Sequence, residues 1–132
     1  LASAIDTSRA TVMNYLQYLR NARLINLLYN NGDEDPAKKP FRIFMHNTNI
    51  LHAIAPEKAD SSARRMTFFY NQAGVGNGVK ASGETGFLVD NKWHFIVGGR
   101  KAEAPPGSYC AADMIETGEG NKIPLWLFGF LY

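Results

Sequence analysis

The stretch that most restricts how this chain can fold is 85–101, where apolar and polar residues alternate on both sides of a short polar break. The break is Asp90-Asn91, and both residue types tolerate the left-handed backbone of a tight turn. We therefore expect a β-hairpin, whose second strand ends at Gly98 because glycine adds no side chain to strand packing. The apolar side chains would line one face of each strand: Phe87, Val89, Trp93, Phe95 and Val97.

Hydrophobic periodicity near the amino terminus predicts a helix-turn-helix. Residues 6–8 are Asp, Thr and Ser, which are good helix N-caps, and the apolar residues after them recur at helical spacing. With the apolar residues 1–5 they make a short helix, a polar turn and a second, amphipathic helix. Residues 24–30 and 41–46 read as strands joined by a polar loop, the layout of a wing after a recognition helix. The chain begins with Leu1, so we expect a fragment whose preceding helix lies upstream.

These features occur in a fixed order with two further segments, 67–72 (TFFYNQ) and 120–132 (GNKIPLWLFGFLY). In this combination the chain resembles the C-terminal region of a large family of predicted bacterial and archaeal AAA-type ATP-binding proteins. Proteins of that family carry a P-loop ATPase core, then a winged helix, then a domain resembling PD-(D/E)xK nucleases. The resemblance implies an α+β fold: a truncated winged helix at 1–46, then a small restriction-endonuclease-like domain with a mixed sheet at 47–132.

The remaining elements of the second part are read from residue pattern. Residues 48–55 and 60–72 predict helices, the first capped by Asn47 or Thr48 and the second opened by Asp60 or Ser61. Residues 109–115 are short and mostly apolar, which fits either a strand or a helical turn. We expect 123–132 to be a buried, bent final strand, because its proline and glycine break a helix.

The resemblance also bears on catalysis. A PD-(D/E)xK nuclease holds Mg²⁺ on converging carboxylates, since hard cations prefer oxygen ligands. Only Glu84 and Asp90 lie near enough to substitute, so a residual nuclease is the weaker alternative and we expect this fragment not to be an enzyme. The resemblance places the nuclease positions on residues that cannot bind a metal: Met66, Gly86, Ile96 and Gly98.

No cofactor is expected in this fragment. The glycine-rich run 74–78 invites a nucleotide-loop interpretation, but Val79 separates its last glycine from Lys80 and no Ser or Thr follows that lysine. We interpret the run as a flexible loop. ATP and Mg²⁺ are implied only for a domain upstream of residue 1.

A non-catalytic accessory module that binds duplex DNA is the function we expect. The groove contacts would come from Arg9, Thr11, Asn14 and Gln17, and the phosphate contacts from Lys38, Lys39 and Arg42. Residues 1–42 hold six Lys and Arg against four Asp and Glu, a small excess. Contact with another protein or self-association, through the apolar segment 126–132, is therefore the alternative.

The single cysteine, Cys110, excludes an internal disulfide and fits a reducing compartment, so we expect a cytoplasmic protein. Its neighbours supply no base, which argues against a catalytic thiol. The sequence contains no signal peptide and no apolar run long enough to cross a bilayer, so no membrane partner is expected.

Overall fold

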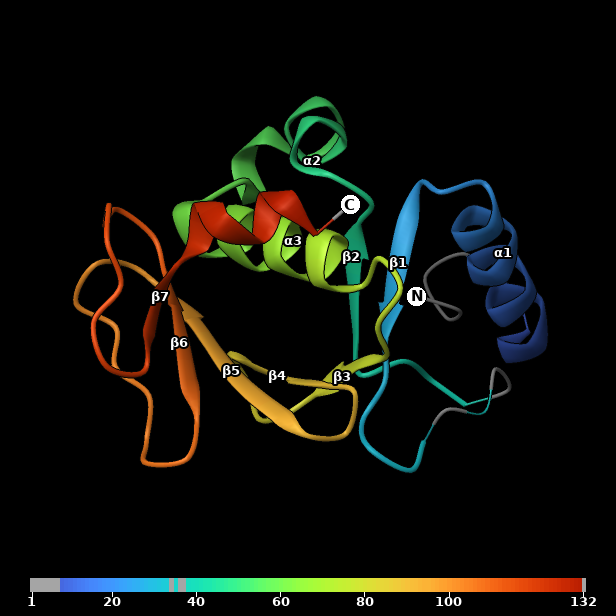
Figure 1. Ribbon diagram of the computed structural model, residues 1–132. Coiled ribbons are helices and arrows are strands. Elements are labelled where there is room, and N and C mark those ends of the chain that lie inside the picture. Colours follow the sequence, from blue (N-terminus) through green and yellow to red (C-terminus); the bar gives the residue numbers. More distant parts are fainter. Residues whose placement is uncertain (1–7, 34, 36–37, 132) are drawn as a thin grey trace.

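The computed structural model describes residues 8–33, 35 and 38–131, which form an α+β fold (Figure 1). Its helices are α1 (Arg9–Asn21), α2 (Thr48–Ile54) and α3 (Ser61–Ala73), with 3₁₀ helices η1 (Pro56–Lys58) and η2 (Leu125–Phe130). Its strands are β1 (Ile25–Leu28), β2 (Arg42–Met45), β3 (Val79–Ala81), β4 (Gly86–Val89), β5 (Trp93–Gly98), β6 (Tyr109–Ala112) and β7 (Lys122–Pro124).

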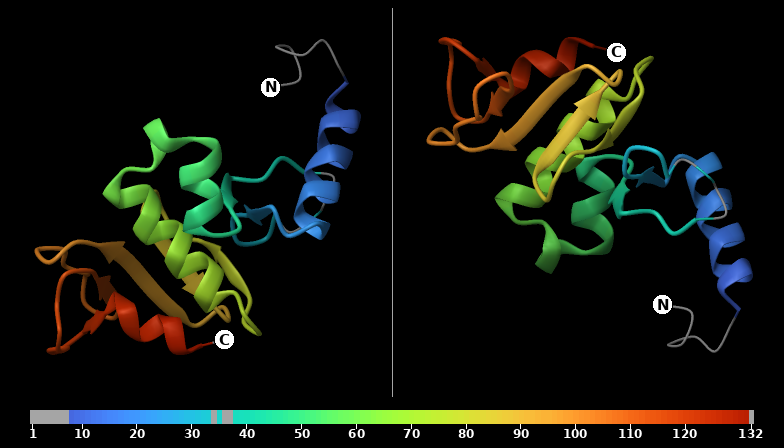
Figure 2. Two further views of the ribbon diagram at one scale, coloured as in Figure 1. Left: turned by 90° about the horizontal axis from the view of Figure 1, so that it is seen from above. Right: turned by 90° about the horizontal axis from the view of Figure 1, so that it is seen from below.

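The strands form two sheets, which backbone hydrogen bonds join after β1. β1 and β2 make an antiparallel pair, and the other strands make a mixed sheet in the order β3-β4-β5-β6-β7. Neighbours are antiparallel from β3 to β5 and parallel from β5 to β7. The chain after β1 reaches the larger sheet, because Ala81 N donates to Tyr29 O at 2.8 Å and Asn30 bridges Ala81 in parallel. α1 and β7 lie at opposite ends of the molecule (Figures 1 and 2).

The predicted hairpin is confirmed as β4 and β5. Asp90 and Asn91 have φ values of 52° and 55°, and two successive positive φ values are the signature of the tight type I′ hairpin turn. Phe87 pairs with Phe95 across the two strands. β5 ends at Gly98, as the glycine pair indicated.

The main hydrophobic core lies between α3 and the mixed sheet, with η2 beside α3 (Figures 1 and 2). Phe69 of α3 and Phe87 of β4 are fully buried, and their ring centroids lie 5.1 Å apart. Burial of such large rings supplies much of the apolar area that stabilises the fold. Further aromatic rings pack around this pair: Phe44, Tyr70, Phe95 and Phe128.

A second, smaller cluster joins α1 to β1, and it contains Val12, Met13, Leu16, Ile25, Leu27 and Tyr29. The two clusters do not divide the chain at the predicted boundary between 1–46 and 47–132. Leu28 of β1 and Phe44 of β2 belong to the main core, together with residues of the second part. None of the helices in the described part of the chain is both long and apolar enough to cross a membrane.

Side chains fix where the helices begin. Asn47 Oδ1 accepts from Ile50 N at 2.9 Å before α2, and Asp60 Oδ1 accepts from Ala63 N at 2.7 Å before α3. Ser8 Oγ accepts from Thr11 N at 3.2 Å before α1. The other predicted caps of α1, residues 6–7, lie outside the described residues. The N-cap signals therefore predicted these helix starts correctly.

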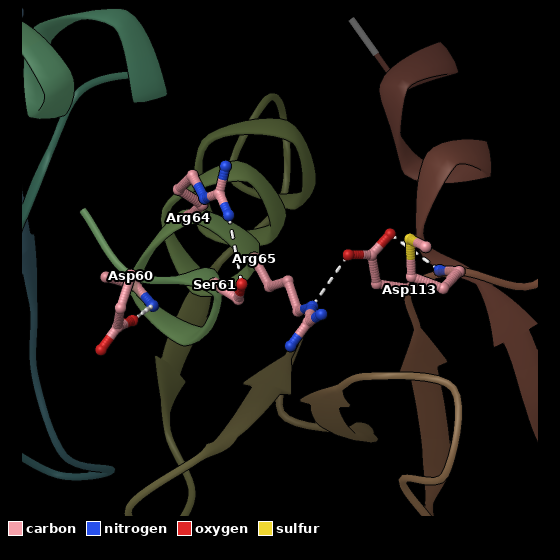
Figure 3. A network of polar contacts seen from close by, with 7 residues as sticks. Asp60, Ser61, Arg64, Arg65 and Asp113 are labelled. Carbon is pink, nitrogen blue, oxygen red and sulfur yellow. Dashed lines mark hydrogen bonds and ion pairs between the residues drawn. The ribbon is translucent and has the colours of Figure 1, made fainter.

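Polar contacts of α3 tie its first turns to the sheet (Figure 3). Arg65 Nε donates to Asp113 Oδ2 at 2.8 Å, which links α3 to the segment after β6. Arg64, one residue earlier, faces another way and donates from Nη2 to Ser61 Oγ at 3.1 Å. Arg65 thus helps to hold the fold, whereas the contact of the exposed Arg64 stays within α3.

The prediction for the closing segment 123–132 was wrong. β7 stops at Pro124, and the chain continues as the 3₁₀ helix η2. In a 3₁₀ helix residues three apart lie above one another, so Leu125 and Phe128 both enter the core. The same geometry leaves Trp126 and Phe130 exposed.

The structure also decides between the two interpretations of 109–115 and adds a strand to the predicted elements. Residues 109–115, which fitted a strand or a helical turn, contain strand β6. The loop around 74–78 is followed by β3, a strand that the sequence did not predict. β3 is only three residues long, too short for alternation to be recognised.

Candidate nucleic-acid interface

The predicted groove residues do not all lie on one face of α1. Thr11, Asn14 and Gln17 follow one another at intervals of three, whereas Arg9 is about 140° around the helix from Asn14. Asn14 is exposed, and the Thr11 hydroxyl lies 2.8 Å from Ser8 Oγ in the helix cap. Gln17 is half-buried, and its Nε2 has no hydrogen-bonding partner among the described residues. Arg9 and Asn14 are therefore the exposed residues among the four.

The predicted wing loop, 31–40, lies between β1 and β2, and its residues 34, 36 and 37 are outside the described part of the chain. Lys38 Nζ lies 2.7 Å from Asp33 Oδ1, and this hydrogen bond and the charge of Asp33 raise the pKa of Lys38. Lys38 is thus always charged near neutral pH but is already paired. Lys39 is exposed and lines a shallow apolar pocket together with Arg9. Arg9 and Lys39 are the two cations best placed to contact a polyanion on this side of α1.

Arg42, the third predicted phosphate contact, has a structural role. Its Nη1 donates to Glu84 O at 2.8 Å and lies 3.7 Å from Met66 Sδ. These contacts fasten β2 to the turn between β3 and β4. The guanidinium is only partly exposed, so Arg42 is not placed as a free contact for DNA.

The structure brings two of the predicted nuclease positions together. Gly86 and Ile96 are partners across β4 and β5, and Gly98 lies further along β5, opposite β6. Gly86 has no room for a side chain, since a Cβ there would lie 2.1 Å from Ser82 O. Met66, on α3, is buried in the core. Packing thus excludes a carboxylate from position 86 in this conformation.

The two acids that could have substituted do not converge. Glu84 precedes β4 and Asp90 follows it, so they lie at opposite ends of the strand. Asp90 Oδ1 accepts from Gly78 N at 2.8 Å, which orders the chain before β3. Within 8–33, 35 and 38–131, no three His, Cys, Asp or Glu side chains form a group that could hold a metal ion.

The structure also contains a cleft that the sequence did not indicate. It has a volume of about 730 Å³ and lies between the carboxyl end of α1, strand β1, the carboxyl end of α3 and the loop leading to β3. Arg20, Arg23 and Lys80 line it, and none of the described lining residues carries a carboxylate. The other polar lining residues are His46, Asn26, Asn71, Gln72, Asn77, Tyr29 and Tyr70.

Arg23 has an unusual backbone conformation at the edge of this cleft. Its φ is +57°, in the left-handed region that favours glycine. Arg23 N donates to Arg20 O at 2.9 Å and Leu24 N donates to Leu19 O at 3.0 Å, the two bonds of a Schellman helix end. Glycine is the usual residue at this position, so arginine is held there at a conformational cost.

Two tyrosines, Tyr29 and Tyr70, line the cleft. Tyr70 OH donates to Leu27 O at 2.8 Å. Burial raises the pKa of Tyr70 to about 12, although the nearby positive charge of Arg20 acts in the opposite direction. The hydroxyl of Tyr29 is buried and has no hydrogen-bonding partner among the described residues. Such a group is rare in folded proteins, because an unpaired buried hydroxyl costs free energy.

The lone cysteine lies far from this chemistry. Cys110 is fully buried in β6, and burial raises the pKa of its thiol, so the thiol is protonated and shielded near neutral pH. The groups that the described residues offer to a ligand are therefore cations, amides and hydroxyls.

Comparisons of the chain with protein families, with curated proteins and with solved structures each gave no match.

Proposed function

We propose that this chain is a cytoplasmic, non-catalytic accessory module of a larger AAA-type ATPase, and that it binds duplex DNA through α1 and the loop after β1. One observation carries the DNA-binding part. The stretch 8–32, which contains α1 and β1, holds three arginines and no acidic residue. Such a segment has a positive field that attracts phosphates, although the loop after it carries Asp33, Glu34 and Asp35.

The arrangement of elements supports this proposal. α1 is followed directly by the antiparallel pair β1–β2, and a polar loop joins the two strands. A recognition helix followed by a wing has this order, and the resemblance to the AAA-type proteins implies such a winged helix before a degenerate nuclease-like domain. Asn14 would face the groove, and Arg9 and Lys39 would contact phosphates.

Fluorescence anisotropy with a labelled duplex, titrated at low and at physiological salt, tests the proposal. Affinity should fall steeply with salt, and Arg9→Ala or Lys39→Ala should each reduce the slope of log K against log salt by about 1. Arg64→Ala is the matched control, because it removes an exposed positive charge on α3. The proposal would be refuted if no binding were seen at low salt. It would also be refuted if Arg9→Ala and Lys39→Ala gave the same slope of log K against log salt as the unmodified chain.

Self-association is a second candidate, because apolar side chains gather near η2. Trp126 and Phe130 are 52% and 70% exposed, and their ring centroids lie 6.2 Å apart. Met114, which is 74% exposed, lines one shallow pocket together with Trp126. Trp126→Glu should then abolish a dimer seen by sedimentation, whereas Ile54→Glu, at an exposed position on α2, should not. A monomer at all concentrations would exclude self-association.

A further inference from the structure

We infer that the cleft between α1 and β3 binds a phosphate-bearing ligand of about nucleotide size. We call it the anion cleft and define it by Arg20, Arg23, Tyr29, Tyr70 and Lys80. It is separate from the proposed DNA contacts, since none of Arg9, Thr11, Asn14, Gln17, Lys38 and Lys39 lines it. The inference therefore does not depend on the DNA-binding proposal.

The charges of the anion cleft are the first support. Arg20 and Arg23 both line it, and neither makes an ion pair with a described residue. Lys80 Nζ donates to the amide oxygens of Asn31 and Asn91, at 3.2 and 2.7 Å, so Lys80 is already engaged within the fold. Two guanidinium groups in one concave site favour a phosphate, whose oxygens accept the paired N–H bonds that arginine offers.

Groups of opposite polarity at the cleft are hydrogen-bonded within the fold. The carboxyl end of α3 is the negative end of a helix dipole. Its carbonyls are bonded, however, since Gly74 N donates to Tyr70 O at 3.0 Å and Asn77 Nδ2 donates to Ala73 O at 2.9 Å. The carboxylate of Asp90 stands at the margin, where it accepts from Gly78 N.

The hydroxyl of Tyr29 is the second, independent support. Tyr29 is 9% exposed, lines the cleft and has no hydrogen-bonding partner among the described residues. Tyr70, in contrast, already donates to Leu27 O. The Tyr29 hydroxyl is almost inaccessible, so a ligand oxygen in the cleft would reach and satisfy it only after a small side-chain movement.

The backbone of Arg23 is the third support. A non-glycine residue in the left-handed region costs folding free energy, and such outliers gather at binding sites. A Schellman end would be more stable with glycine. The arginine side chain therefore has a use that outweighs the conformational cost.

The size of the cleft indicates what accompanies the phosphate. At about 730 Å³ it falls within the range of roughly 300–1,000 Å³ that small-molecule sites occupy, and it is far larger than an inorganic phosphate requires. The amides of Asn26, Asn71 and Gln72 offer both donors and acceptors. A nucleotide, either free or as one unit of a nucleic-acid strand, matches this chemistry.

Isothermal titration calorimetry with adenosine monophosphate and with a short single-stranded oligonucleotide tests the inference. At least one probe should bind, and Arg23→Gly should weaken that binding about tenfold or more, because a charge-assisted hydrogen bond is lost. Tyr29→Phe should weaken it severalfold. Arg64→Gln, which removes an exposed charge from α3, should leave binding unchanged.

The melting temperature separates loss of the site from loss of the fold. Arg23→Gly should melt no lower than the unmodified chain, because glycine suits the left-handed backbone. Binding of the mononucleotide would identify a free ligand, and binding of the oligonucleotide alone would identify a nucleic-acid strand. The inference is overturned if neither probe binds, or if Arg23→Gly binds as tightly as Arg64→Gln.

Discussion

Replacing Gly86 with alanine tests how strictly the packing of β4 requires glycine. Gly86 is the first residue of the strand, and an alanine Cβ would lie 2.1 Å from Ser82 O and 3.3 Å from Ile96 Cδ1. The contact with Ile96 can be relieved by a small side-chain movement. The contact with Ser82 cannot, because the atom belongs to the backbone.

The cost follows from that geometry. Ordinary non-bonded contacts begin near 3.5 Å, so the backbone at Ser82 would have to move by about 1 Å or more. Ser82 N also donates to Gly86 O at 3.0 Å, and the movement would strain this bond. Overpacking costs typically about 1–3 kcal/mol and more where backbone must shift. We expect Gly86→Ala to lower the free energy of unfolding by about 3 kcal/mol and the melting temperature by about 10 °C.

Urea unfolding followed by tryptophan fluorescence measures this change, since Trp93 reports on the central strand β5 and Trp126 on η2. The matched control is Gly99→Ala, whose Cβ would lie an ordinary 3.5 Å from the Arg65 guanidinium. The control should unfold within about 0.5 kcal/mol of the unmodified chain. If Gly86→Ala unfolds at the same urea concentration as the control, the packing described for β4 is wrong.

Three further outcomes follow from backbone geometry and burial. Arg23→Gly should raise the free energy of unfolding, measured in urea, by about 0.5–1 kcal/mol. Glycine removes the cost of holding a side-chain-bearing residue in the left-handed region, and the greater backbone entropy of glycine in the unfolded chain offsets part of this gain. Tyr70 has its pKa raised from 10.0 to about 12, so its stabilisation is complete below pH 10 and is lost between pH 10 and 12. Urea unfolding at pH 9 and 11.5 should therefore show a smaller pH-dependent loss for Tyr70→Phe than for the unmodified chain. Cys110 should react with a thiol reagent only as fast as the protein unfolds, because it is fully buried and its thiol pKa is raised.

The elements that could be predicted from sequence depend on local chemistry. The β4–β5 hairpin was found because Asp90 and Asn91 favour the turn that their φ values show. The starts of α2 and α3 were found because Asn47 and Asp60 are strong caps, and both caps are formed. Turn and cap preferences act within a few residues, so they are visible in one sequence.

What could not be predicted depends on contacts between distant segments. The closing segment was expected to be a strand, and its 3₁₀ geometry follows from where Leu125 and Phe128 meet α3. The anion cleft is assembled from the segment that holds Arg20 and Arg23 and the segment around Lys80, and these two segments lie far apart along the chain. The only local signal for it was the absence of acidic residues from 8–32, which does not reveal what packs opposite α1.

The arginines of this chain fall into two groups, those that hold elements of the fold together and those that make no ion pair with a described residue. Arg42 bonds Glu84 O and Arg65 pairs with Asp113, so both hold elements of the mixed sheet to their neighbours. Arg20 and Arg23, at the end of α1, make no ion pair within the described part of the chain, and the backbone of Arg23 opposes folding. Because folding does not require these two guanidinium groups, their place in one cleft is better explained by an anionic ligand than by stability. Neutralising them should therefore alter binding while the α+β fold stays intact, which no change at Arg42 or Arg65 can achieve.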